Sequence, residues 1–149
     1  MSVKQRIPFA TIIIALLIAI IQIFRILGGP YENFLAYNLH TGNWEWYYNQ
    51  PWRIITSSFM HHHDILHYLG NLVTLCLFGW KIERSLGRTI LLIAFFGAMV
   101  TAYVVWVNVM NGWLIGISGG VCGLFGLSLI ANRRVPWWTT LTHSPLHLF

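Results

Sequence analysis

The chain has 149 residues, of which 56% are hydrophobic and 9% are charged, and its formal net charge is +5. Soluble domains carry roughly 25% charged residues, so this composition excludes a disordered chain and most soluble enzymes. The few basic residues are scattered, which argues against nucleic acid as a partner. Cys76 and Cys122 lie in apolar runs, where we expect them to pack as small apolar side chains and form no disulfide.

Four apolar stretches approach the length of about 20 residues that a membrane-spanning helix requires. They occupy residues 7–27, 62–80, 89–110 and 116–132. The last two belong to one uncharged run, which must fold back at the turn-forming residues that follow position 110. Residues 29–53, rich in Asn, Tyr and Trp, are interpreted as an outer interfacial loop, and 133–149 as a cytoplasmic tail. The sequence therefore predicts one all-α domain over residues 1–149, a polytopic membrane bundle of four transmembrane helices.

Lysine and arginine are distributed unequally between the ends of these spans. If the N-terminus is cytoplasmic, only Arg25 and Arg53 lie on the outer side. The other basic residues then lie inside, namely Lys4, Arg6, Lys81, Arg84, Arg88, Arg133 and Arg134. Cytoplasmic loops of membrane proteins carry an excess of Lys and Arg, so we expect a multi-pass protein of the cell membrane with a cytoplasmic N-terminus.

Three polar clusters interrupt the apolar spans, and polar groups in a membrane are costly enough to be functional candidates by default. The first is Ser118 within Gly-Ile-Ser-Gly-Gly, residues 116–120. The second pairs His67 with Asn71, one turn apart on one helix face. The third is His-His-His-Asp at residues 61–64.

Each cluster also has a purely structural interpretation. The glycines around Ser118 have the small-xxx-small spacing of closely packed membrane helices, and His67 with Asn71 suits interhelical hydrogen bonds. The functional interpretation is a serine nucleophile at a helix N-terminus, with N–H donors facing a developing oxyanion. It is favoured because Ser118 and His67 each lie near the outer end of their span.

A metal site is the weaker alternative for the histidines. His63 and His67 share a helix face as in the zinc motif H-E-x-x-H, but Asp64 stands where that motif needs Glu. No third ligand of suitable type follows in a later span, so we expect no metal and no cofactor.

Together these residues resemble the rhomboid family of intramembrane serine proteases. The similarity covers PWRIITSSFMHHHDILHYLGNLVTLCLFG, KIERSLGRT and GISGGVCGLFG. Its ordered motifs are Trp52 and Arg53 in the first outer loop, His67 and Asn71 in the second span, Glu83 and Gly87 in the following connection, and Gly116, Ser118 and Gly119 in the fourth span.

The resemblance implies the first four spans of a six-helix rhomboid core, with Ser118 as the nucleophile. It implies that His67 and Asn71 hold the oxyanion beside the Ser118 backbone N–H. Trp52 and Arg53 are expected to support the site from the outer loop.

An outer-loop histidine of the family is expected to give further support. Counting back from His67 assigns it to His62, whereas counting on from Arg53 assigns it to His61.

By resemblance, the general base of the family is a histidine in a sixth span, and this chain reaches only a short tail after the fourth. His143 and His147 are expected on the cytoplasmic side, far from Ser118. We therefore expect a rhomboid-type serine endopeptidase that cleaves transmembrane helices of single-span membrane proteins, present as a C-terminally incomplete copy without its base. The alternative is a non-catalytic rhomboid-like protein that binds client transmembrane helices.

An incomplete copy is expected to self-associate or to need its missing C-terminal portion. The reason is that Gly119, Gly123 and Gly126 would lack one of their packing partners.

Overall fold

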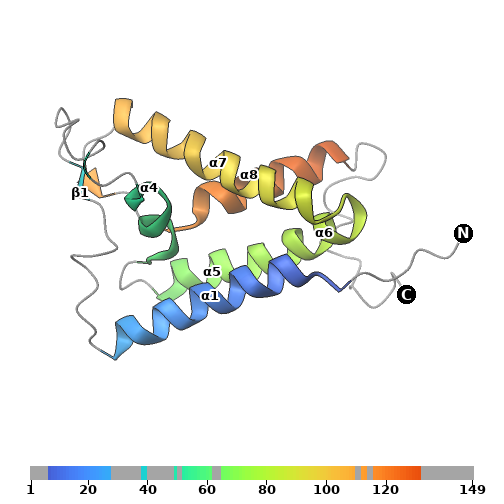
Figure 1. Cartoon of the computed structure of the whole chain (residues 1–149), viewed down its shortest axis with the longest axis horizontal. Helices are drawn as coiled ribbons and strands as arrows, with labels where there is room; N and C mark the ends of the chain where they lie inside the picture. The colour runs from blue at the N-terminus through green and yellow to red at the C-terminus, as the bar shows by residue number, and fades with distance from the viewer. Residues whose placement is uncertain are drawn as a thin grey trace, which may run out of the picture.

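The computed structural model describes residues 7–27, 38–39, 49, 52–61, 65–109, 112–113 and 116–131. Its elements in chain order are α1 (Phe9–Ile26), β1 (Asn38–Leu39), α4 (Arg53–Thr56), the 3-10 turn η1 (Ser57–Phe59), α5 (Ile65–Thr74), the π turn η2 (Leu75–Gly79), α6 (Trp80–Ser85), α7 (Arg88–Val109), β2 (Gly112–Trp113) and α8 (Ser118–Ala131). The prediction of an all-α membrane bundle is confirmed (Figure 1).

Three of the described helices are long and apolar enough to cross a membrane: Phe9–Ile26, Ile65–Ser85 and Arg88–Trp106. The second runs through α5, η2 and α6 without a break and continues past Trp80. The helix α8 is apolar but has 14 residues, fewer than the roughly 20 that a straight span needs. The chain is thus built as a multi-pass membrane protein.

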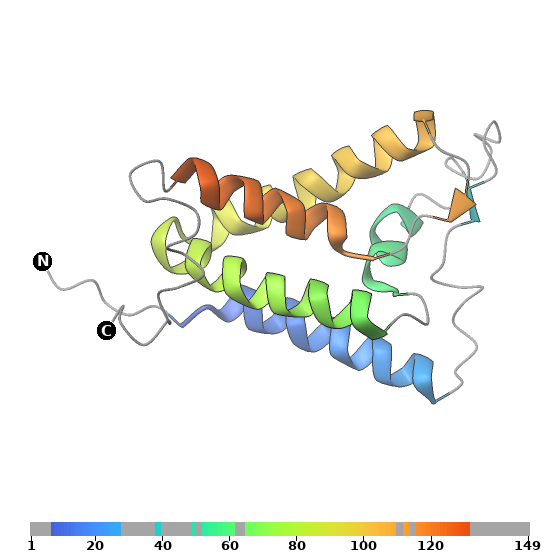
Figure 2. The same cartoon turned by 180° about the vertical axis from the view of Figure 1, so that it is seen from behind.

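Two pairs of helices make up the bundle. The helices α1 and α5 run side by side, and α7 packs across α8 (Figures 1 and 2). The strands β1 and β2 pair antiparallel, with Asn38 opposite Trp113 and Leu39 opposite Gly112. This short pairing ties the connection after α1 to the connection between α7 and α8.

The close packing of α7 on α8 depends on glycine. A Cβ added to Gly119 would lie 2.7 Å from the Ala102 Cβ, and one added to Gly123 would overlap the Ala98 Cβ. The helix α7 therefore supplies one packing partner for these two glycines, and the expectation that another partner is lacking stays a prediction. At Gly126, by contrast, no described atom lies within 4 Å of the Cβ position.

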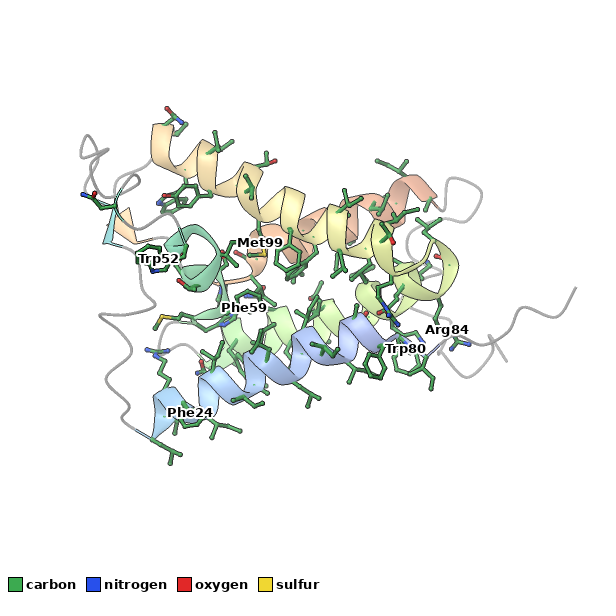
Figure 3. All side chains as sticks on the ribbon, viewed as in Figure 1. Phe24, Trp52, Phe59, Trp80, Arg84 and Met99 are labelled. Atoms are coloured by element: carbon green, nitrogen blue, oxygen red, sulfur yellow. The ribbon has the colours of Figure 1, made fainter. Side chains whose placement is uncertain are left out.

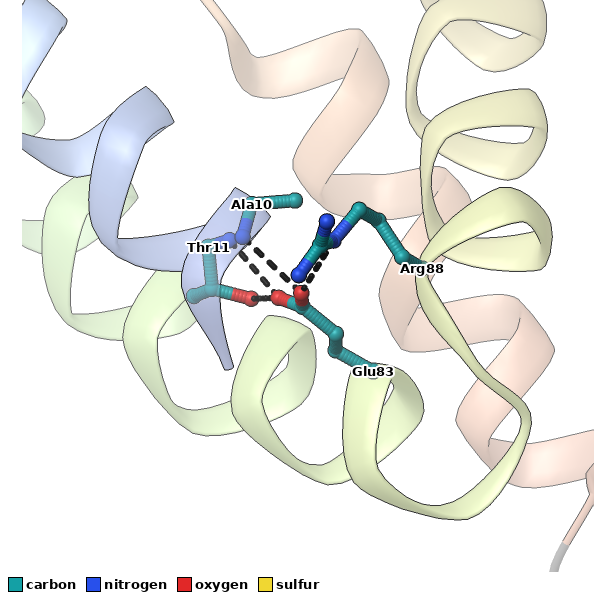
Figure 4. A network of polar contacts seen from close by, with 4 residues as sticks. All are labelled: Ala10, Thr11, Glu83 and Arg88. Carbon is teal, nitrogen blue, oxygen red and sulfur yellow. Dashed lines mark hydrogen bonds and ion pairs between the residues drawn. The ribbon is translucent and has the colours of Figure 1, made fainter. Parts of the chain in front are cut away.

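Glu83 holds the second span against α1 (Figure 4). Its buried carboxylate accepts hydrogen bonds of 2.8 Å each from the Ala10 N–H, the Thr11 N–H and the Thr11 hydroxyl. The Arg88 Nε lies 3.3 Å from the same group. The first N–H groups of a helix have no partner within it, and Pro8 provides no side-chain cap. Glu83 therefore caps α1 from another part of the chain.

The π turn η2 sets the rotation of the second span. In a regular α-helix, residues spaced like Asn71 and Glu83 point about 120° apart. The extra residue of a π turn reduces this difference to about 20°, and both side chains are buried on the bundle side. At Gly79 the helix approaches α1 so closely that a Cβ would lie 2.9 Å from the Thr11 Cγ2.

The interior and the outer surface are both apolar, as a bilayer environment requires. Phe59 and Met99 lie inside the bundle, whereas Phe24 points outward from α1 (Figure 3). Cys76 and Cys122 are exposed on the helix surfaces. An apolar surface position suits a thiol in a membrane, and the expectation that the two cysteines pack as small apolar side chains stays a prediction.

Candidate active site

The centre of the candidate site is the side-chain amide of Asn71 on α5. Its Nδ2 lies 3.1 Å from the Nε2 of His67, one turn earlier, and 3.2 Å from the Nε2 of His61. Asn71 is 9% exposed and His61 is 1% exposed, so this amide lies in the protein interior. The spacing of His67 and Asn71 explains the first contact, because residues four apart are neighbours on a helix face.

His61 reaches the amide because the segment before it folds into the bundle. The Trp52 carbonyl accepts the N–H groups of Ile55 and Thr56, both at 3.0 Å, and so starts the short helix α4. The residues of η1 that follow are all buried. At the end of this segment, the guanidinium of Arg25 donates a hydrogen bond to the His61 carbonyl. The C-terminal end of α1 therefore anchors His61 beside α5.

The loop that carries the Gly-x-Ser-Gly motif lies against both histidines. A Cβ at Gly116 would lie 3.6 Å from the His67 Nε2 and 3.7 Å from the His61 Nε2. The Gly116 N–H donates to the Ser57 carbonyl at 3.3 Å, and the residue has a φ of +99°. Glycine is required here because other residues rarely adopt that conformation.

Ser118 follows two residues later as the first residue of α8, and it is half-buried. The first regular contact of the helix runs from the Val121 N–H to the Ile117 carbonyl at 3.0 Å. The backbone N–H groups of Ser118 to Gly120 thus lie at the positive end of the helix dipole, where an anion is stabilised. Among the described residues, none forms a hydrogen bond with the Ser118 hydroxyl.

Burial lowers the pKa of His61 from 6.5 to about 4, with smaller contributions from the neighbouring imidazole of His67 and the charge of Arg25. His61 is therefore neutral at pH 7. An amide nitrogen only donates, so the Nε2 of His61 is the acceptor of the bond from Asn71 and its Nδ1 carries the proton.

The structure brings His67 and Asn71 together and places Gly116, two residues before Ser118, against His67. The catalytic roles of Ser118, His67 and Asn71 stay predictions. Trp52 opens α4 and is half-exposed. Arg53 begins α4, but its side chain lies outside the described part of the structure. His62 lies outside the described residues as well.

The two counts along the sequence assigned the outer-loop histidine either to His62 or to His61. Counting on from Arg53 leads to the histidine that contacts Asn71. The contribution of Arg25 carried no signal in the sequence, because a positive charge at the end of a span is also explained by membrane topology.

Within the described residues there is no group of three or more His, Cys, Asp or Glu side chains arranged to hold a metal ion. His63 and Asp64, on which the metal alternative depended, lie outside those residues.

Comparison with known proteins places this geometry in context. Residues 48–148 match the family described as Rhomboid domain. The chain is 31% identical over 125 residues to the rhomboid protease GlpG of Haemophilus influenzae, a match that covers 83% of this chain and 62% of the relative. It is 32% identical over 96 residues to YdcA of Bacillus subtilis, which is assigned as a rhomboid protease, covering 63% of this chain and 45% of the relative. The matches thus span about half to three-fifths of these relatives.

Proposed function

The chain belongs to the rhomboid family, and on that premise we propose that it is an intramembrane serine endopeptidase. Its substrates are single-span membrane proteins, cleaved at a peptide bond within or near the transmembrane helix. The observation that carries the proposal is the position of Gly116 within van der Waals reach of His61 and His67. This contact brings the Gly-x-Ser-Gly loop to the same end of the bundle as the Asn71 amide.

In the proposed reaction, the Ser118 Oγ attacks the substrate carbonyl carbon, and its proton passes to a general base. The oxyanion is held by the Ser118 backbone N–H together with Asn71 and His67, since donors aimed at developing charge are effective in a site that excludes water. The base then protonates the leaving amine, and water hydrolyses the acyl-enzyme. By the family resemblance the base is a histidine of a sixth span, so the proposal requires a base from outside the described residues.

The proposed orientation places this site near the outer leaflet. The helices α5 and α8 begin at the end of the bundle where α1 finishes (Figures 1 and 2). Trp80 and Arg84, whose guanidinium lies 5.9 Å from the Trp80 ring centre, mark the opposite end (Figure 3). With a cytoplasmic N-terminus, water and substrate reach Ser118 from outside.

A fluorophosphonate probe tests for an activated serine in the detergent-solubilised chain. We expect labelling of the wild type and none of Ser118→Ala. Ser128→Ala is a matched control, because Ser128 lies on the same helix and its hydroxyl donates to the Phe125 carbonyl. Labelling that persists in Ser118→Ala contradicts the assignment of the nucleophile, and an unlabelled wild type contradicts catalysis by this chain.

A second function is supported by the Ser118 hydroxyl, which has no hydrogen-bond partner among the described residues. A serine without an adjacent base is a poor nucleophile. If no base acts on Ser118, the chain binds client transmembrane helices without cutting them. Photo-crosslinking to a single-span protein that is equally strong in the wild type and in Ser118→Ala, without cleavage in either, supports this alternative.

A further inference from the structure

His61 connects three separate parts of the bundle. Its carbonyl accepts a hydrogen bond from Arg25 at the end of α1. Its ring packs edge-on against Tyr68 of α5, with 5.4 Å between ring centres. Its Nε2 faces both Asn71 and the Cβ position of Gly116. The backbone of His61 is thus anchored by Arg25, and its ring is held by Tyr68 and Asn71 of α5.

The amide of Asn71 has two N–H groups and two imidazole neighbours. His61 is almost fully buried, whereas His67 is exposed on the helix surface. The bond to His61 is therefore the one shielded from water, and a shielded hydrogen bond is the more costly to break. The N–H directed toward His67 lies on the side that an incoming oxygen atom can reach.

We propose that His61 is a positioning residue for Asn71. By accepting one amide N–H, it holds the amide plane so that the other N–H points to the Nε2 of His67, beside the Gly116 loop. This inference rests on the proposed function, because in the proposed reaction the oxyanion forms beside the Asn71 amide. His61 itself does not touch the substrate.

The test compares two replacements of His61 in the full chain. His61→Gln keeps an acceptor oxygen near the Nε2 position, whereas His61→Phe keeps the ring and removes the acceptor. We expect His61→Phe to lower kcat about tenfold with KM changed less than twofold, as for a transition-state interaction. His61→Gln should restore most of the rate. Thr74→Ala, a half-buried position on the helix of Asn71 whose hydroxyl donates to the Gly70 carbonyl, should leave the rate unchanged.

A double-mutant cycle shows whether His61 acts through Asn71. In an Asn71→Ala background, His61→Phe should have no further effect on kcat. An equal tenfold loss in that background overturns the proposal, as does a His61→Gln variant that is no better than His61→Phe.

A spectroscopic readout separates this inference from the proposed function. The side-chain amide resonances of Asn71, followed by ¹⁵N NMR in micelles, should be retained in His61→Gln and shifted toward free-amide values in His61→Phe. Unchanged resonances in His61→Phe overturn the positioning role even if the chain is a protease. If the Asn71 resonances shift as expected in His61→Phe but Ser118 is not labelled by the probe, the proposed function is wrong and the contact between His61 and Asn71 still holds. If His61→Phe fails to fold, the Asn71 resonances are compared between the wild type and His61→Gln. Resonances in folded His61→Gln that show a free Asn71 amide overturn the positioning role of His61.

Discussion

Glu83 and Thr11, which are far apart in the sequence, are joined by two hydrogen bonds of 2.8 Å, one to the backbone N–H of Thr11 and one to its hydroxyl. The pair connects the first turn of α1 with the C-terminal end of the second span (Figure 4). Removing the carboxylate would leave helix N–H groups buried without an acceptor.

We therefore expect Glu83→Ala to reduce the free energy of unfolding by roughly 3 kcal/mol, and Glu83→Gln by about 1 kcal/mol because one acceptor oxygen remains. Thermal unfolding in detergent, followed by circular dichroism, measures both. Ser85→Ala is the control, since Ser85 is exposed and its hydroxyl bonds only within its own helix. Equal stability of Glu83→Ala and the control would show that Glu83 does not cap α1.

The contact between Gly123 and Ala98 leaves no room for a side chain. Gly123→Ala should push α7 and α8 apart and cost about 2 kcal/mol, as overpacking does. Gly126→Ala on the same helix has free space and should be neutral or stabilising by up to about 1 kcal/mol, because alanine favours helix. The double variant Gly123→Ala with Ala98→Gly should recover most of the loss; no recovery would contradict the contact.

Gly116 and Gly87 offer a matched pair, because both have a positive φ, +99° and +95°. Replacing either by alanine should cost about 1–2 kcal/mol of backbone strain. Only Gly116→Ala should also reduce probe labelling of Ser118, since only its Cβ reaches the histidines. Equal labelling of the two variants would separate the Gly116 loop from the site.

The stability of the fold should depend on pH through His61. Its pKa is about 4 in the folded chain, below the ordinary 6.5, because of burial. The unfolded chain therefore takes up the proton first, so stability is complete above pH 6.5 and falls as the pH drops toward 4. Unfolding measured across this range should be less pH-dependent in His61→Gln. His67, Arg25 and Tyr68 also face His61, and because they remain in the variant, the difference between the two curves isolates His61.

The proposed orientation predicts that both ends of the chain are cytoplasmic. An epitope tag at either terminus should react with antibody only after the membrane is permeabilised. A tag inserted in the outer loop at residues 29–53 should react in intact cells. A terminal tag that reacts in intact cells would place Ser118 near the inner leaflet and reverse the route of the substrate.

The sequence predicted the spans and the principal candidates for the site because these depend on local properties. Hydropathy is summed along one stretch of chain, and the spacing of His67 and Asn71 places them on one face of any helix. The motif around Ser118 could be read in the same way, although the sequence did not distinguish catalysis from helix packing. In the structure, Gly119 packs on Ala102, while Gly116 faces the histidines, so one motif contributes both to the helix contact and to the candidate site.

Contacts between distant elements were decided only in three dimensions. That His61 contacts Asn71 depended on how η1 enters the bundle, which the one-residue ambiguity between the two counts along the sequence left open. The burial of Glu83 under α1 depended on the π turn, because a single extra residue rotates everything after it by about 100°. Apolarity determines that a segment enters the membrane, but the rotation and depth of each helix determine which side chains meet. Those two quantities are properties of the packed bundle and not of any one span.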